Sequence, residues 1–221
     1  MTNSMLPSQT IPEPLLQRIR EARIIAVVVI DDPADAVPLA ESLIAGGIQA
    51  IELTLRTSTA FESLRRIREA CPSMLAGLGT VLFPEQVTAA VEGGAAFAVA
   101  PGLNPDVVRA AQAAGLPFGP GIVTPSDIEG AVRLGSRLLK LFPAEPCGGV
   151  AFLKSISAPY AHLGLEYIPL GGLNEHNFTG YLALKNVPAV GGSWIAPREL
   201  IQAKDWKAIR ENASRALAKT K

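Results

Sequence analysis

The sequence has few of the residues that characterise disulfide-rich, metal-binding and membrane proteins. It contains two cysteines and two histidines in 221 residues. Cys71 and Cys147 are far apart and neither belongs to a CxxC pair, so neither a disulfide framework nor a zinc site is indicated, and a reducing cytoplasm suits both thiols. There is no apolar run of about 18 residues. The first stretch, MTNSMLPSQTIPEP, lacks a basic segment followed by an apolar one, so we expect neither a membrane span nor a secretion signal.

The chain also lacks an excess of charge of either sign. Lys and Arg together number 20, and so do Asp and Glu. A neutral chain has no overall field that would attract nucleic acid or an anionic membrane, so we expect neither as a partner. The 48% of hydrophobic and 18% of charged residues are typical of a globular protein. We therefore expect a cytoplasmic, globular protein without a strongly charged macromolecular partner.

Eight short apolar runs recur along the chain, and each is followed by a turn signal and then a helical pattern. They lie at 24–30, 50–55, 75–80, 96–101, 117–122, 138–143, 167–172 and 189–194. This alternation is typical of βα units, and eight units fit a (β/α)₈ barrel, with a doubly wound open sheet as the alternative. The apolar spacing predicts an extra helix at 12–22 and C-terminal helices at 197–219. We expect residues 1–221 to form one barrel domain, with its eight strands within 24–194.

One of these runs, LLKLFP at 138–143, places a lysine in an otherwise apolar segment. Lys140 lies between Leu139 and Leu141, and Leu138 and Phe142 follow on either side. Burial disfavours the charged form of a lysine, and a neutral amine is a nucleophile. The alternative is that Lys140 lies at a strand end and extends its ammonium group to water.

A second run, AIELTLR at 50–56, carries polar residues at every second position. Because side chains alternate along a strand, Glu52, Thr54 and Arg56 share one face, and this face would point to the barrel axis. Unpaired charges are costly to bury, so charged groups on this face suggest a binding site. The alternative is that Glu52 and Arg56 pair with each other or lie at an exposed strand end.

Several candidate residues follow the carboxyl ends of the predicted strands, which is where barrel enzymes place their active sites. Arg56, Thr80, Pro101 and Lys140 lie near such ends, as do two glycine pairs. The pairs are Gly171-Gly172 and Gly191-Gly192, the second followed by Ser193. Glycines leave backbone amides bare, and barrels commonly bind phosphate between the loops after strands seven and eight. The glycine pairs therefore indicate a phosphate site.

Two long segments resemble a known family. GIQAIELTLR at 47–56 and GSRLLKLFPAEPCG at 135–148 are similar to the signature segments of the 2-keto-3-deoxy-6-phosphogluconate (KDPG) and 4-hydroxy-2-oxoglutarate (KHG) aldolases. GLGTVL, FAVAPG, PGIVTPSDI and VGGSWI are also similar, so the resemblance covers essentially all eight units. It implies a homotrimeric, metal-free, class I (β/α)₈ aldolase of the Entner–Doudoroff pathway, which cleaves KDPG to pyruvate and glyceraldehyde 3-phosphate. Many members also cleave KHG to pyruvate and glyoxylate.

The resemblance also implies a role for each candidate residue. Lys140 would form a Schiff base, and Glu52 would move protons through a water molecule. The pyruvate unit would be held at its carboxylate by Arg56 and Thr80, covered by Phe142 and lined by Pro101. The phosphate would be held by Gly171, Gly172, Gly192 and Ser193. No cofactor or metal is implied, because the lysine imine carries out the chemistry.

The residue types suit this chemistry on general grounds as well. Cleaving a carbon–carbon bond beside a hydroxyl requires an electron sink two atoms away, and a protonated imine is a better sink than a ketone. A carboxylate can remove the C4 hydroxyl proton and later protonate the enamine, and Glu52 is the inward-facing carboxylate beside Lys140. A planar guanidinium pairs well with a carboxylate, which suits Arg56.

One residue departs from the family pattern. Leu170 stands before the first glycine pair, where the phosphogluconate aldolases often have a threonine that recognises the substrate's hydroxyl stereochemistry. A leucine cannot donate that hydrogen bond, so the phosphogalactonate epimer, KHG or another 2-keto acid is an alternative substrate.

Two other functions could use the same barrel. A sugar-phosphate isomerase or synthase would share the glycine pairs but would not need Lys140, and a non-catalytic phosphometabolite-binding barrel would form no imine. The two histidines, His162 and His176, have no second ligand at metal spacing and are interpreted as structural or solvated. Asp127 and Glu145 follow strands five and six and could reach the site, although acids in the first turn of a helix are favoured by its dipole.

Overall fold

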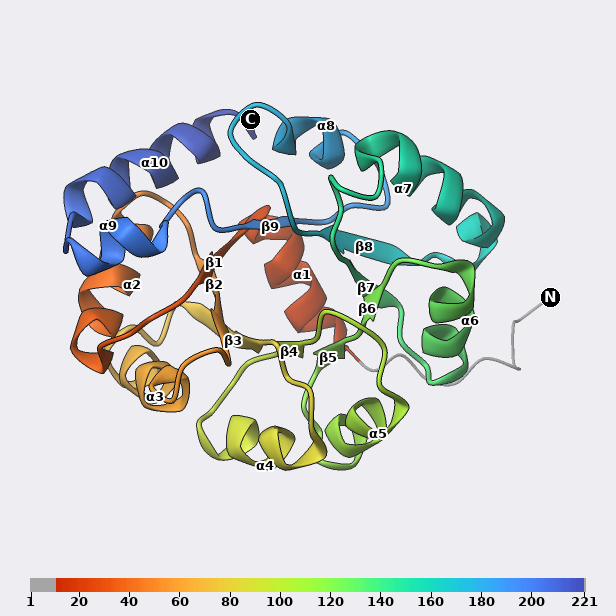
Figure 1. Ribbon diagram of the computed structural model, residues 1–221, viewed down its shortest axis with the longest axis horizontal. Coiled ribbons are helices and arrows are strands. Elements are labelled where there is room, and N and C mark those ends of the chain that lie inside the picture. The colour runs from red at the N-terminus through yellow and green to blue at the C-terminus, as the bar shows by residue number, and fades with distance from the viewer. Residues whose placement is uncertain (1–10, 221) are drawn as a thin grey trace.

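The computed structural model describes residues 11–220, and these form a ring of parallel strands with α1 across one end and the other helices around the outside (Figure 1). The strands are β1 Ile24–Val28, β2 Ala50–Thr54, β3 Leu75–Gly79, β4 Ala98–Val99, β5 Phe118–Gly119, β6 Gly121–Ile122, β7 Leu138–Leu141, β8 Glu166–Pro169 and β9 Val190–Gly192. The helices are α1 Glu13–Ala22, α2 Ala36–Ala45, α3 Ala60–Ala70, α4 Pro84–Glu92, α5 Pro105–Ala113, α6 Pro125–Arg133, α7 Gly149–Ser157, α8 Phe178–Leu182, α9 Arg198–Gln202 and α10 Trp206–Ala218, with short 3₁₀ helices at Pro33–Asp35 and Ala158–Leu163.

The fifth predicted strand, 117–122, is divided into β5 and β6 by Pro120, which has no N–H to donate to a ladder. β5 pairs with β4, whereas β6 pairs with β7, so the two halves join sheet β5-β4-β3-β2-β1-β9 to sheet β6-β7-β8. The Lys140 amide bridges the break by donating to the Pro120 carbonyl at 2.9 Å. On the other side β8 adjoins β9, and the Tyr167 amide donates to the Asn186 carbonyl at 2.8 Å. The ring therefore closes as a (β/α)₈ barrel, and the open-sheet alternative is wrong.

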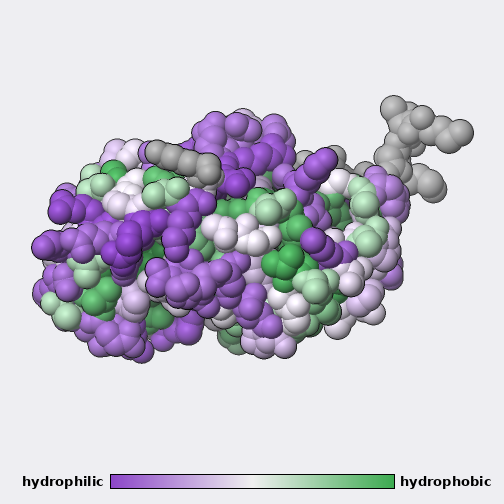
Figure 2. Space-filling view, turned by 90° about the horizontal axis from the view of Figure 1, so that it is seen from above, coloured by the Kyte–Doolittle hydropathy of each residue, from purple (hydrophilic) through white to green (hydrophobic). Residues whose placement is uncertain are grey.

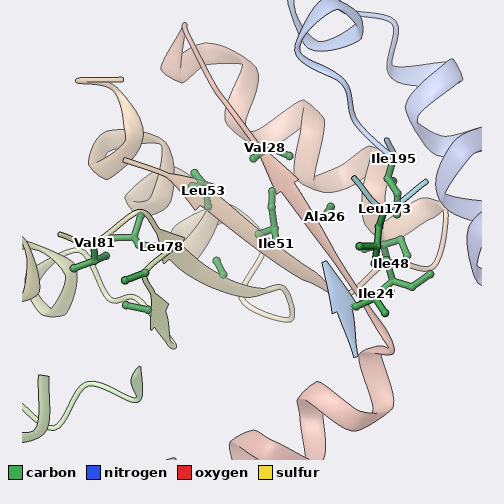
Figure 3. Packing of buried hydrophobic residues seen from close by; sticks show 14 of the residues in the cluster. Ile24, Ala26, Val28, Ile48, Ile51, Leu53, Leu78, Val81, Leu173 and Ile195 are labelled. Carbon is green, nitrogen blue, oxygen red and sulfur yellow. The ribbon is translucent and has the colours of Figure 1, made fainter. Parts of the chain in front are cut away.

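The side chains of the strands separate into two apolar layers. Outward-facing residues pack under the helices, and Figure 3 shows Ala26 and Val28 of β1 beside Ile51 and Leu53 of β2 in this layer. The inner layer fills the barrel, with members Ile25, Val27, Ala50, Leu75, Phe97, Val99, Leu138, Ile168, Leu170 and Ala189. Burying one large aliphatic side chain contributes about 1.5–3 kcal/mol, so both layers hold the strands in register. This alternation places Glu52, Thr54 and Lys140 on the inner face.

Helix α1 closes the amino-terminal end of the barrel. Its Leu16 and Ile19 are buried against the inner layer, as the apolar spacing of 12–22 predicts. Arg20 anchors the helix, because its guanidinium donates from Nε and Nη2 to the two carboxylate oxygens of Glu166, each at 3.1 Å. A bidentate pair of this kind fixes orientation as well as distance. The carboxyl-terminal ends of the strands are therefore the open end.

The outer surface is mixed in character. Figure 2 shows hydrophilic side chains over much of one face, with apolar patches among them. Within residues 11–220, no helix has the length and hydropathy needed to cross a bilayer.

Candidate active site

A cavity of about 320 Å³ lies at the carboxyl-terminal end of the strands. All ten residues named by the sequence for the site line it, namely Glu52, Arg56, Thr80, Pro101, Lys140, Phe142, Gly171, Gly172, Gly192 and Ser193. They come from β2, β7 and β9 and from segments following β2, β3, β4, β7, β8 and β9. The fold thus brings together residues separated by up to 141 positions, the separation of Glu52 and Ser193. The other lining residues are Val27, Thr54, Leu170, Leu173 and Gly191.

Lys140 and Glu52 form a buried ion pair at the base of this cavity. The Lys140 Nζ lies 2.8 Å from the Glu52 Oε1, and the two residues are 6% and 2% exposed. The alternatives in which Lys140 reaches bulk water or Glu52 pairs with Arg56 are therefore wrong. Desolvating two charges costs several kcal/mol each, and close contact offsets this cost only in good geometry. The sequence argument considered the burial of Lys140 alone, whereas the structure gives the ammonium a counter-charge.

Two glycines on β3 leave space inside the barrel, one for the Glu52 carboxylate and one for the Phe97 ring. Gly77 and Gly79 are aligned with Glu52 and Thr54 across the β2–β3 ladder. A methyl group added at Gly79 would overlap the Glu52 carboxylate, and one at Gly77 would lie 2.5 Å from the Phe97 ring. The two glycines are visible in the run LAGLG, but the sequence does not show which side chains need the space beside them. That depends on the register between β2 and β3. Sequence reasoning therefore missed both glycines.

Arg56 and Thr80 lie at the mouth of the cavity, on the segments after β2 and β3. The Arg56 side chain makes no hydrogen bond or ion pair within residues 11–220, so its guanidinium is available to an anionic ligand. Thr80 has a φ of +61°. A β-branched residue in this left-handed region costs on the order of 1–3 kcal/mol, and such backbone conformations cluster at functional sites. Thr80 is therefore held beside Arg56 at an energetic cost.

Phe142 and Pro101 form apolar parts of the wall. Phe142 is 38% exposed, and its ring centroid lies 5.9 Å from the Lys140 Nζ. At this distance the ring face attracts a cation. Pro101 packs against Gly121, where any side chain would collide with the Pro101 backbone. The aromatic ring therefore sits between the lysine and solvent.

The far end of the cavity is made of glycine backbone. Gly171 and Gly172 have φ values of +92° and +83°, a region that glycine adopts without strain. Gly191 and Gly192, with Ser193, approach from β9. Leu170 forms the wall between the two glycine pairs, and a methyl group on Gly191 would lie 2.6 Å from its Cδ2. This part of the cavity offers backbone amides and one hydroxyl but no hydrogen-bond donor from the side chain of Leu170.

The remaining candidates lie outside the cavity. His162 and His176 do not line it, and within residues 11–220 no group of three or more His, Cys, Asp or Glu could hold a metal ion. The Asp127 carboxylate accepts hydrogen bonds from the amides of Val123 and Thr124, so it caps α6. Glu145 also lies outside the cavity lining and contacts the glycine segment instead.

The chain matches the family model for KDPG and KHG aldolases over residues 15–212. A 2-dehydro-3-deoxy-phosphogluconate aldolase from Haemophilus influenzae is 40% identical over 195 residues, which are 88% of this chain and 91% of the relative. The crystal structure of a KDPG aldolase from Legionella pneumophila, with pyruvate captured as a covalent carbinolamine intermediate, matches with a TM-score of 0.86 and 38% identity, covering 91% of this chain and 97% of that one. A KDPG aldolase from Zymomonas mobilis, with 3-phosphoglycerate, matches with a TM-score of 0.83 and 34% identity, covering 91% and 94%.

Proposed function

The chain belongs to the KDPG and KHG aldolase family, and from this premise we propose that it is a class I aldolase that cleaves KDPG to pyruvate and glyceraldehyde 3-phosphate. The observation that carries the proposal is the buried contact of Lys140 Nζ with Glu52 Oε1, at 2.8 Å. A lysine that must attack a carbonyl needs a base in contact with it, and this carboxylate is within proton-transfer distance. An isomerase using Glu52 alone would not need the buried lysine.

Carbinolamine formation is the first step of the proposed mechanism. Lys140 transfers a proton to Glu52, and its free amine attacks C2 of the keto acid. The carbonyl oxygen takes up a proton from the newly bonded nitrogen, and Glu52 then returns its proton to this hydroxyl. Water leaves, the protonated imine remains on Lys140, and Glu52 is again a carboxylate. Arg56 and Thr80 would hold the substrate carboxylate, because the Arg56 guanidinium has no other partner among residues 11–220.

Carbon–carbon cleavage follows on the imine. Glu52 accepts the C4 hydroxyl proton, directly or through a water, and the electrons of the C3–C4 bond move into the protonated imine. The aldehyde forms at C4 and the enamine of pyruvate remains on Lys140. Glu52 then returns the proton to C3, and water hydrolyses the imine to release pyruvate. One carboxylate thus serves in both directions, which its contact with Lys140 permits.

The phosphate end of the substrate would lie against Gly171, Gly172, Gly192 and Ser193. Their backbone amides and the serine hydroxyl are suited to phosphate oxygens, and the loops follow the seventh and eighth barrel strands, where barrels commonly bind phosphate. Phe142 would cover the pyruvyl unit, and Pro101 would line its pocket. Because Lys140 and the glycine pairs line the same cavity, a substrate bound at Lys140 with its terminal phosphate at the glycines is supported.

Leu170 favours a second candidate substrate. Its apolar side chain lies in the cavity wall, where it cannot donate a hydrogen bond to a substrate hydroxyl. The same lyase chemistry on the phosphogalactonate epimer, on KHG or on another 2-keto acid is therefore the alternative. Kinetic constants for the two C4 epimers and for KHG distinguish these substrates, and Leu170→Thr is expected to raise the preference for one epimer.

We further propose a cytoplasmic homotrimer that uses no metal or other cofactor. Both described cysteines are free thiols, which suits a reducing compartment. Leu82, Phe83 and Val91 expose 39%, 58% and 43% of their surface, and apolar side chains of this kind are commonly covered by a subunit contact. Light scattering would give three times the chain mass of 23.2 kDa for a trimer.

Borohydride trapping tests the proposed function. The protein is incubated with pyruvate, reduced with borohydride and mapped by peptide mass. We expect a pyruvyl adduct on Lys140 and none in Lys140→Met. An adduct on another lysine, or none in the folded wild-type protein, would refute the imine mechanism.

A further inference from the structure

Glu145 is a titratable residue outside the proposed chemistry, yet it contacts the glycine segment directly. It lies in the segment between β7, which carries Lys140, and α7. The Glu145 amide donates to the Gly171 carbonyl at 3.0 Å, and the preceding Ala144 amide donates to the Leu170 carbonyl at 2.7 Å. These bonds continue the parallel pairing of β7 with β8 beyond the strand ends. The segment after β7 therefore runs beside the first glycine pair.

The Glu145 side chain packs on Gly172. A methyl group added to Gly172 would lie 2.6 Å from the Glu145 Cβ and 3.1 Å from its Cγ. The carboxylate end points to Gly149, at the start of α7. A methyl group added to Gly149 would lie 3.3 Å from the Glu145 Oε1. The methylenes thus support the glycine backbone, while the negative charge lies at the amino terminus of a helix, where it is favourable.

Tyr181 of α8 fixes this orientation. Its Oη donates to the Glu145 Oε1 at 2.5 Å, and the tyrosine is fully buried. Burial, and then the hydrogen bond to Glu145, raise the pKa of Tyr181, so its hydroxyl remains a donor throughout the physiological range. A hydrogen bond to a carboxylate is stronger than one between neutral groups. Tyr181 therefore holds the carboxylate away from Gly172.

The glycine segment is also held from its other side. The Asn177 Nδ2 donates to the Gly172 carbonyl at 3.1 Å, and the Asn177 Oδ1 accepts from the Asn174 amide at 2.8 Å. Because Asn177 immediately precedes α8 and Tyr181 lies within it, the contacts form a closed ring. The ring runs from Glu145 to Tyr181, along α8 to Asn177, and back through Gly172 to Glu145.

From this ring we infer that Glu145, fixed by Tyr181, is a positioning residue that holds the Gly171-Gly172 backbone at a set distance from Lys140 and so sets the affinity for the phosphate end of the substrate. The inference rests on the proposed function, because it assigns the phosphate to this backbone. Glu145 does not line the cavity, so it acts through Gly172 and not by touching substrate. Its negative charge would repel a phosphate if the carboxylate turned towards the glycines.

The test compares one keto acid with and without its terminal phosphate. Tyr181→Phe removes one hydroxyl and keeps the ring. We expect its KM for KDPG to rise about five- to tenfold, with kcat within twofold, because one charge-assisted hydrogen bond is lost. The KM for 2-keto-3-deoxygluconate, which lacks the phosphate, should change less than twofold. Glu145→Gln keeps the methylenes and an oxygen acceptor and should remain within twofold of wild type, whereas Glu145→Ala should exceed the effect of Tyr181→Phe.

Tyr160→Phe is the matched control. It removes a Tyr–Glu hydrogen bond of 3.1 Å, to Glu129, at an exposed position away from the cavity. We expect no change in either KM. An equal rise for both keto acids in Tyr181→Phe, or no rise for either, would overturn the inference. Circular dichroism checks that each variant is folded.

Two further readouts separate this inference from the proposed function. Pyruvate trapping at Lys140 tests the imine and should proceed at the wild-type rate in Tyr181→Phe. Calorimetry with inorganic phosphate tests the glycine segment without turnover, and the dissociation constant should rise in Tyr181→Phe but not in Tyr160→Phe. A wild-type protein that traps no pyruvate would refute the aldolase, whereas normal trapping with an unchanged phosphate constant in Tyr181→Phe would refute the role of Glu145.

Discussion

Replacing Lys140 by Met tests the energetics of the buried ion pair. The Lys140 and Glu52 side chains are 7% and 3% exposed, and their charged atoms are 2.8 Å apart. Removing one partner leaves the Glu52 carboxylate buried without a counter-charge, which costs about 3–5 kcal/mol. For a chain of this size, each kcal/mol lowers the Tm by about 2–4 °C. We therefore expect Lys140→Met to unfold roughly 6–20 °C below the wild-type protein.

A double variant shows whether the loss comes from the unpaired charge. Lys140→Met/Glu52→Leu replaces both charges by apolar groups of similar size, which is often neutral or stabilising for a buried pair. It should regain most of the lost Tm, although it remains inactive. The assay is thermal unfolding followed by circular dichroism at pH 7.

Lys207→Met is the control for the loss of a lysine charge alone. Its partner Glu211 is 4.0 Å away, and both side chains are more than half exposed. Exposed pairs contribute about 0–1 kcal/mol, so the Tm should stay close to wild type. The reasoning is wrong if Lys140→Met is as stable as wild type. It is also wrong if the loss of Tm in Lys140→Met/Glu52→Leu equals the sum of the losses in Lys140→Met and Glu52→Leu measured separately.

Three further predictions concern other residues. Gly79→Ala should abolish pyruvate trapping, since its methyl group would displace the Glu52 carboxylate, and a normal rate of trapping would contradict this packing. Arg56→Gln should raise the KM for KDPG about tenfold or more, because the substrate carboxylate loses a charge-assisted pair, and an unchanged KM in steady-state kinetics would remove Arg56 from the site. The Arg198 guanidinium, hydrogen-bonded to Asp31, lowers the pKa of that carboxyl from 3.8 to about 2. The stability that this ion pair contributes is present above pH 3.8 and is lost as the pH falls towards 2. The Tm difference between wild type and Asp31→Asn should therefore be constant above pH 5 and shrink below pH 4. A difference that grows on acidification would contradict this assignment.

The fold could be predicted from the sequence because its signals are local. Alternating apolar runs and helical patterns repeat eight times, and each unit carries its own turn residues. The break at Pro120 was not predicted, because the two halves of that strand pair with different neighbours, and pairing partners are not visible in a local pattern. Strand ends also differ from the predicted ranges by up to three residues, because element boundaries are the least reliable part of a prediction from local pattern.

The site was predictable only as far as residue type and strand phase allow. Alternation along 50–56 predicted Glu52 and Arg56 on one face, and the structure has Glu52 in β2 and Arg56 in the turn after it. The family resemblance supplied the predicted roles. Glu52 was expected beside Lys140, but their direct ion pair was not predicted, since the two residues are 88 positions apart and their contact depends on how the two sheets close into the ring. Glu145 had the same limitation, because its contact with Tyr181 joins the segment after β7 to helix α8, and local sequence does not relate these two elements. The contacts between side chains that are distant in the sequence are therefore set by the arrangement of the strands and helices, which local sequence patterns do not show.

The closure of the barrel by α1 also bears on the order in which products leave. Leu16 and Ile19 fill the amino-terminal end, so within residues 11–220 the cavity at Lys140 opens at the strands' carboxyl-terminal end. The aldehyde and the water that hydrolyses the imine must then use the same passage, past Phe142 and the glycine segments. Pyruvate stays bonded to Lys140 until that water arrives, whereas the aldehyde is free once the C3–C4 bond is broken. An aldolase built in this way releases its two products in a fixed sequence, aldehyde first and pyruvate second.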